Sequence, residues 1–137
     1  MLDRHDAVVR AIVGRSGGSV AKTIGDGVLA LLPSAGTCLR VAASVRHDLA
    51  AEGLNVRIGV HVGDIDRQSD DVSGLAVNIA SRAMSTAGTG EIVVTAPVVA
   101  AAAGQAVAFE SLGAHELKGV PGAWELFRVA TEAEGLG

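Results

Sequence analysis

Residues 19–32 read SVAKTIGDGVLALL, two apolar runs on either side of Gly-Asp-Gly. Short aliphatic and β-branched runs bounded by turn residues are typical of strands, and Asp-Gly is a common hairpin turn. The stretch therefore predicts a β-hairpin with Asp26 at its tip. Glycines beside Asp26 would let a ligand or cation approach the carboxylate closely, although an ordinary Asp-Gly turn accounts for the same residues when they are taken alone.

Predicted helices and strands continue on both sides of this hairpin. Residues 3–16 carry an apolar stripe and predict a helix that begins at Asp3. Further elements are predicted as a helix over 34–51, a strand over 55–62, a loop over 63–73, a helix over 74–86, a strand over 91–95, a short helix over 96–103, and late strands at 109, 115–117 and 124–129. This order predicts an α+β fold with helices over a mostly antiparallel sheet.

Length and composition exclude several classes of protein. The chain has 137 residues, enough for one domain over about residues 1–130 with a frayed tail over 131–137. Its net charge of −4 gives no overall positive field for nucleic acid. The single cysteine excludes an intrachain disulfide, and the scattered histidines do not predict a structural zinc site. With no long apolar run and no secretory signal, we expect a cytoplasmic protein without membrane contact.

Two further motifs carry polar groups that suit phosphate chemistry. Residues 71–82 read DVSGLAVNIASR, and Asn78 and Arg82 are four positions apart, so a helix places them on one face. An amide and a guanidinium that point together can orient and neutralise a phosphoryl group, although a solvated helix face accounts for them too. Residues 116–121 read ELKGVP, and Lys118 taken alone is a surface lysine.

The glycine-rich residues 14–23, GRSGGSVAKT, superficially suggest a phosphate-binding P-loop. That motif requires glycine six positions before the lysine and directly before it, where this chain has Ser16 and Ala21. It also requires a strand followed by a helix, whereas the order predicted here is the reverse. A P-loop is therefore not predicted.

Taken in order, residues 22–27, 71–82 and 117–120 resemble the catalytic domain of class III nucleotidyl cyclases, of the bacterial adenylate cyclase type. The resemblance extends from Asp3 to about Val129. It implies a ferredoxin-like α/β sandwich and a head-to-tail dimer with sites at the interface. The implied reaction is attack of the ribose 3′-hydroxyl of ATP on its α-phosphate, giving cyclic AMP and diphosphate, with two Mg²⁺ or Mn²⁺ ions.

The resemblance also implies roles for individual residues. Asp26 would be a metal-binding aspartate, and Lys22 and Asp71 would read the purine. Asn78 would orient the ribose, and the two cations Arg82 and Lys118 would bind phosphates. The purine pair can be checked chemically, because adenine offers an acceptor at N1 and a donor at its amino group, which match a lysine and an aspartate. Guanine reverses both, so the pair predicts ATP as the substrate.

One part of the family pattern is not found within these residues. The first strand, with the first metal-binding aspartate and a following helix, should precede Asp3. We therefore expect a fold that lacks this strand, and little cyclase activity from this chain alone. Two readings follow. The chain is most of an adenylate cyclase domain that is cut short and whose full-length form is an enzyme, or it is a partner subunit that lends purine-binding and transition-state residues to another cyclase chain. A homodimer or a heterodimer with another cyclase domain is expected accordingly. An unrelated ferredoxin-like ligand-sensing module is a third.

Overall fold

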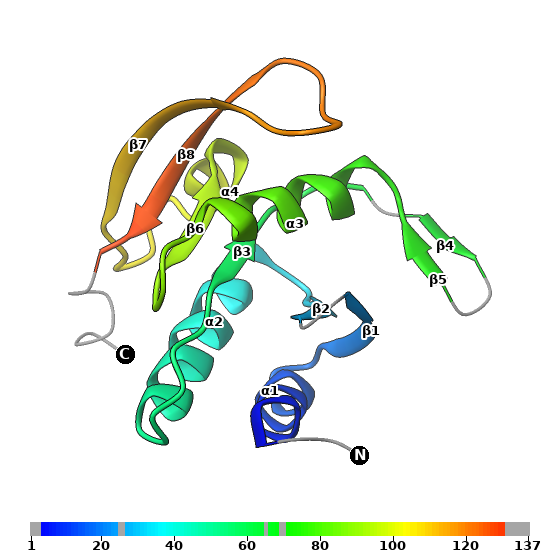
Figure 1. Ribbon diagram of the computed structural model, residues 1–137, viewed down its shortest axis with the longest axis vertical. Helices are drawn as coiled ribbons and strands as arrows, with labels where there is room; N and C mark the ends of the chain where they lie inside the picture. The colour runs from blue at the N-terminus through cyan, green and yellow to red at the C-terminus, as the bar shows by residue number, and fades with distance from the viewer. Residues whose placement is uncertain (1–3, 25–26, 65, 69–70, 131–137) are drawn as a thin grey trace.

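The computed structural model describes residues 4–24, 27–64, 66–68 and 71–130 and contains both helices and strands (Figure 1). In chain order its elements are α1 (Arg4–Arg15), β1 (Ser19–Ile24), β2 (Gly27–Leu31), α2 (Ala35–Ala50), β3 (Ile58–Val60), β4 (Asp66–Gln68), β5 (Asp71–Ser73), α3 (Leu75–Thr86), β6 (Ile92–Thr95), α4 (Ala96–Ala101), β7 (Phe109–Glu116) and β8 (Ala123–Val129). The predicted α+β class is confirmed.

The largest sheet is four-stranded, in the order β3-β6-β8-β7. β3 and β6 run parallel, while the β6–β8 and β7–β8 pairs are antiparallel. The other described strands form two separate hairpins, β1–β2 and β4–β5. Most strand pairs are thus antiparallel, as predicted, but the strands are divided among three sheets.

Strand β6 is the centre of the hydrophobic core, and all four of its residues are buried. Successive side chains of a strand point to opposite faces of the sheet. Ile92 and Val94 accordingly pack in the cluster that contains residues of α2 and α4, whereas Val93 packs with Ile79 and Ala83 of α3. Helices therefore cover both faces of the sheet.

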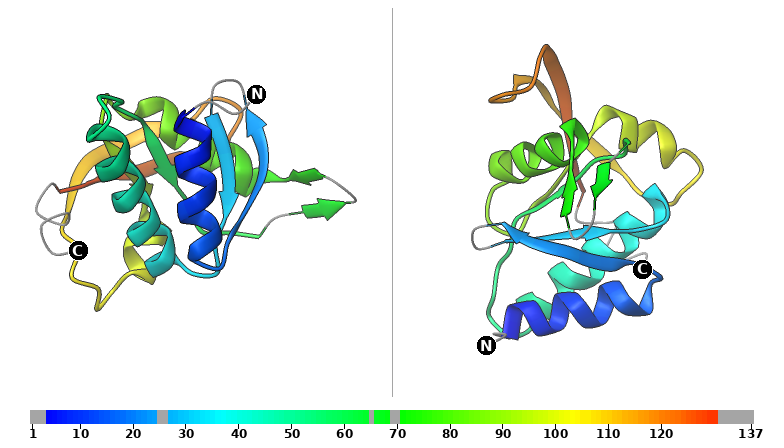
Figure 2. Two further views of the ribbon diagram at one scale, coloured as in Figure 1. Left: turned by 90° about the horizontal axis from the view of Figure 1, so that it is seen from below. Right: turned by 90° about the vertical axis from the view of Figure 1, so that its right-hand side faces the viewer.

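Helices α1 and α2 pack against each other and against the β1–β2 hairpin, which Figure 2 shows from below. Val13 of α1 and Leu49 of α2 are among the buried residues of this second layer. The start of α2 is fixed by Ser34, whose side chain accepts a hydrogen bond of 3.1 Å from the Thr37 backbone N–H. The periodicity of residues 34–51 predicted this helix correctly.

Three of the predicted boundaries need correction. Residues 63–73 contain the β4–β5 hairpin where the sequence predicted only a loop. This hairpin projects from the body of the protein beyond the start of α3 (Figures 1 and 2). Strand β3 covers three residues rather than the predicted 55–62, and β7 is a single strand of eight residues. Asp3, Asp26 and the predicted tail over 131–137 lie outside the described residues.

Among the described residues, no helix combines the length and the apolar character that spanning a bilayer requires.

Candidate active site

Lys22 and Asp71, predicted to read the purine, lie on two strands that contact each other. Lys22 is half-buried in β1, where it pairs with Leu29 just after an irregularity in the ladder. Asp71 is the first residue of β5 and pairs with Gln68. Because β1 contacts β5, the fold brings these two positions into one region although they are far apart in sequence.

Asn78 and Arg82 lie on α3, which begins directly after β5. The turn between β5 and α3 uses Gly74 with a φ of 120°, a conformation that other residues rarely adopt. Both side chains are exposed and, four residues apart, share one face of the helix. A second face carries the buried Ile79 and Ala83. The predicted ribose and phosphate residues therefore point into solvent from a helix that is anchored on its other side.

Lys118 lies in the loop between β7 and β8, and its side chain is exposed. Leu117 and Val120 on either side of it are buried, and they pack in the same cluster as Ile79 and Ala83 of α3. The loop is thus fastened to the sheet layer that also supports α3. The predicted site residues that the structure describes lie on β1, β5, α3 and this loop. They are Lys22, Asp71, Asn78, Arg82 and Lys118.

The predicted metal ligand, Asp26, lies outside the described residues, so its role stays a prediction. Within residues 4–24, 27–64, 66–68 and 71–130, no group of three His, Cys, Asp or Glu side chains is arranged to hold a metal ion. Hard divalent cations need several oxygen ligands.

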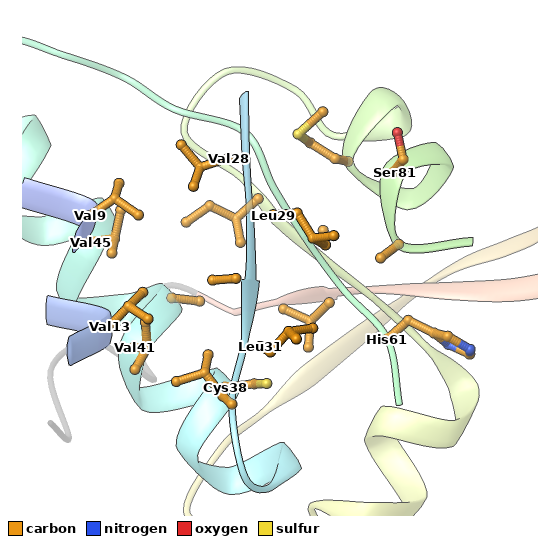
Figure 3. Close-up of a pocket in the computed structure, with 18 of the residues that line it drawn as sticks. Val9, Val13, Val28, Leu29, Leu31, Cys38, Val41, Val45, His61 and Ser81 are labelled. Atoms are coloured by element: carbon orange, nitrogen blue, oxygen red, sulfur yellow. The ribbon is translucent and has the colours of Figure 1, made fainter. Parts of the chain in front are cut away.

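A mainly apolar cavity lies elsewhere. It has a volume of about 440 Å³, is lined mainly by apolar side chains, and lies between β2, β3, α2 and α3 (Figure 3). None of the predicted site residues lines it, because α3 presents Ala80, Ser81 and Met84 to the cavity and not Asn78 or Arg82. The candidate active site is instead an open surface.

Sequence patterns did not single out His61, which the structure places in a polar cluster at the ends of β3 and β6. Its Nδ1 lies 2.7 Å from Oγ1 of the fully buried Thr95, and its ring and that of Trp124 form a T-shaped pair at a centroid distance of 5.6 Å. Burial lowers the pKa of His61 below its ordinary value. Thr95 is 34 positions away in sequence, so no local pattern predicts this contact. The one available signal is that His61 directly follows an apolar strand.

The family model described as "Adenylate and Guanylate cyclase catalytic domain" matches residues 1–131. The chain belongs to the class III nucleotidyl cyclase family. Its fold is that of solved cyclase catalytic domains. A Silicibacter pomeroyi adenylate/guanylate cyclase/hydrolase superposes with a TM-score of 0.79 at 26% identity, covering 90% of this chain and 79% of that one. The catalytic core of a rhodopsin-guanylyl cyclase with converted specificity, in complex with ATPαS, gives 0.80 at 27% identity, covering 93% and 78%.

Curated relatives of this cyclase domain are longer proteins. A Rhizobium meliloti (strain 1021) protein provisionally named adenylate cyclase 3 is 30% identical over 129 residues, which are 88% of this chain and 22% of that protein. An adenylate cyclase of Streptomyces coelicolor is 31% identical over 89 residues, 64% of this chain and 23% of that protein. The chain thus spans less than a quarter of the length of these relatives.

Proposed function

We propose that this cyclase domain is an adenylate cyclase, which converts ATP into 3′,5′-cyclic AMP and diphosphate at an interface between two cyclase domains. The observation that supports ATP most directly is the contact between β1 and β5, since these strands carry Lys22 and Asp71. A lysine donor and an aspartate acceptor on adjoining strands match N1 and the amino group of adenine. Guanine reverses both groups, so the lysine donor would face a donor and the aspartate acceptor would face an acceptor.

The exposed face of α3 supports the phosphate part of this proposal. Asn78 would orient the ribose, and Arg82 would stabilise the negative charge that develops on the α-phosphate. Both groups are exposed in the single chain. That exposure suits a site completed by a second cyclase domain, because water must be displaced for a guanidinium to act strongly. Lys118 would bind the terminal phosphates, and Asp26 would contribute to binding Mg²⁺ or Mn²⁺.

A second candidate function is that of a partner subunit, which lends its purine-binding and phosphate-binding residues to a metal site held by another cyclase chain. One observation favours it. The described elements carry all of the proposed purine, ribose and phosphate residues. In this case the chain alone would bind ATP but form little cyclic AMP.

One experiment tests both candidates. The purified protein is incubated with ATP or GTP and Mn²⁺, and cyclic AMP and cyclic GMP are quantified. The assay is repeated after mixing with a second cyclase domain whose own transition-state arginine has been replaced. Cyclic AMP from the protein alone supports the enzyme, and cyclic AMP from the mixture alone supports the partner subunit. Cyclic GMP in preference to cyclic AMP, or no product in either assay, contradicts the assignment to ATP cyclisation.

A further inference from the structure

His61, Thr95 and Trp124 connect three strands of the four-stranded sheet. His61 directly follows β3, Thr95 is the last residue of β6, and Trp124 is the second residue of β8. A hydrogen bond joins His61 to Thr95, and the T-shaped ring pair joins His61 to Trp124. Although His61 borders the apolar cavity, its ring points away from β2 (Figure 3). The imidazole is therefore held between a hydroxyl group and an indole.

Thr95 fixes the orientation of this imidazole. The side chain of Thr95 is fully buried, and although Thr95 is the N-cap residue of α4, its hydroxyl group caps no backbone N–H of that helix in the described part of the chain. A buried hydroxyl group that loses its hydrogen-bond partner is costly, so the pair with His61 is maintained in the folded protein. With one ring nitrogen held, the imidazole keeps a defined direction towards Trp124.

Trp124 connects His61 to the loop that carries Lys118. The indole Nε1–H donates a hydrogen bond of 3.2 Å to the backbone carbonyl oxygen of Pro121 in this loop. The indole also packs against the buried cluster that supports α3 and includes both apolar residues of the loop. Trp124 thus holds the loop through a polar and an apolar contact.

Lys118 itself lies in a tight turn. The backbone N–H of Val120 donates a hydrogen bond of 2.9 Å to the carbonyl oxygen of Leu117, and Gly119 between them has a φ of 80°. A positive φ at the third position matches a type II turn, in which Lys118 takes the second position. The backbone of the lysine is therefore fixed within the turn, while its side chain is exposed.

Gly122 lies between this turn and β8, with a φ of 84°. A glycine gives the chain a wide choice of direction at this point. The hydrogen bond from Trp124 to Pro121 spans Gly122, so it determines the direction in which the turn leaves the strand. Because His61 holds Trp124, it contributes to the position of Lys118 from a distant part of the sequence.

We propose that His61 is a positioning residue, which holds the Lys118 turn through Trp124 so that the lysine meets the terminal phosphates of a nucleoside triphosphate. This inference rests on the phosphate role proposed above for Lys118. The ring of His61 transmits the effect to the turn, and the hydrogen bond to Thr95 keeps the ring in place.

Two substitutions separate the ring of His61 from its hydrogen bond. Asparagine keeps a polar group opposite the Thr95 hydroxyl group, whereas phenylalanine keeps a ring against Trp124. Calorimetry measures the binding of ATP and of inorganic tripolyphosphate. We expect His61→Asn to weaken both by about three- to tenfold, the scale of one edge-to-face ring pair, and His61→Phe to bind nearly as well as the natural protein. The Tm should fall further in His61→Phe, because a buried hydroxyl group then lacks its partner.

A double-substitution cycle tests whether His61 acts through Lys118. Lys118→Ala alone should weaken the binding of tripolyphosphate. Added to Lys118→Ala, His61→Asn should have little further effect, whereas two independent contributions would give additive losses. His47→Asn, at an exposed position of α2, is the matched control and should leave binding unchanged with either residue at position 118.

Two measurements follow the turn without any nucleotide. Hydrogen exchange at the Val120 amide, which closes the turn, should be faster in His61→Asn but not in His61→Phe. Trp124 is the single tryptophan of the sequence, which contains no tyrosine, so the anisotropy of tryptophan fluorescence reports the mobility of this indole. The anisotropy should fall in His61→Asn alone.

A merely structural role of His61 predicts different results. Equal weakening of tripolyphosphate binding in the two His61 variants, additive losses in the cycle, or unchanged binding in His61→Asn would overturn the proposal. If His61→Phe does not fold, the cycle with His61→Asn decides the matter. If the natural protein binds neither ATP nor tripolyphosphate, the phosphate role of Lys118 fails, and exchange at the Val120 amide then decides separately whether His61 holds the turn.

Discussion

Gly59 of β3 lies directly beneath the backbone of α3 at Ala80. A Cβ atom at position 59 would lie 2.5 Å from the Ala80 carbonyl oxygen and would also collide with the Met84 backbone nitrogen. Real Cβ atoms do not approach backbone atoms so closely, and neither neighbour is a flexible side chain. The absence of a side chain at Gly59 therefore sets the distance between α3 and the sheet.

We predict that Gly59→Ala lowers the free energy of unfolding by about 1–3 kcal/mol, as overpacking commonly does. Gly14→Ala is the matched control, since Gly14 is helical and a Cβ atom added there would have no neighbour within 4 Å. That control should raise stability by about 0.5–1 kcal/mol. Urea denaturation of both variants measures the difference, and equal stabilities would show that α3 is not held in this way.

We predict that His61 makes the protein less stable in mild acid. Burial lowers the pKa of His61 in the folded state, so the unfolded chain binds more protons as the pH falls through its ordinary value of 6.5. The stability that depends on neutral His61 is therefore fully present above about pH 6.5 and decreases towards the lower, folded-state pKa.

The measurement is the free energy of unfolding at pH 7.5 and pH 5.5 for the natural protein and for His61→Gln. The loss between the two values should be larger in the natural protein. Titration of Glu91 does not overlap this pH range, because hydrogen bonds from Gly88 and Arg128 lower the pKa of its carboxyl below its ordinary value of 4.5. An identical pH dependence in the two proteins would exclude His61 as the titrating group.

We predict that Lys22→Glu changes purine selectivity. An acceptor replaces the donor opposite adenine N1, so the preference for ATP over GTP should fall by about tenfold or more, the usual scale for losing a charged hydrogen bond. Nucleotide binding and, where product forms, kcat/KM measure the ratio. Arg10→Glu, an equal charge change at an exposed position of α1, should leave it unaltered.

We predict that Arg82→Ala lowers cyclic AMP formation by about 10²-fold, because one such contact to developing charge is commonly worth that much. Since Arg82 is exposed, the Tm should stay within about 2 °C of the natural value. Ser85→Ala on the same helix is the control and should preserve activity. A loss of activity that tracks a loss of Tm would mean that the arginine acts through the fold.

We predict that, in a form of the protein that has cyclase activity, the inactive Asp26→Ala and Arg82→Ala variants recover activity when they are mixed. In a two-fold dimer with shared sites, one site of the mixed dimer carries both defects and the other carries neither. Activity should approach about half of the natural value per mixed dimer on this two-fold argument. If subunit exchange is demonstrated and the mixture stays inactive, the two residues do not belong to opposite sides of a shared site.

Local sequence patterns predicted the elements that have a buried face. The periodicity of residues 34–51 located α2, and the runs around Asp26 located β1 and β2. The β4–β5 hairpin was missed because residues 63–73 are mostly polar, and a hairpin that projects from the body has no buried face to impose alternation.

Those local patterns could not predict contacts between segments that are distant in sequence. The contact between Gly59 and α3, the pairing of His61 with Thr95, and the separation of β2 from β3 all depend on how distant segments pack. The site residues came from motif order rather than periodicity. Their elements are adjacent in the structure, but the roles of the individual side chains remain predictions.

Helix α3 contacts the sheet through Ile79 and Ala83, borders the cavity through Ala80 and Met84, and presents Asn78 and Arg82 to solvent. A helix constrained on two sides has little freedom to rotate or slide. The backbone that carries the amide and the guanidinium is then ordered during folding, so that a nucleotide has only their side-chain rotamers left to order. Backbone preorganisation of this predicted phosphate-binding face is thus a property of the aliphatic residues on the hidden sides of α3.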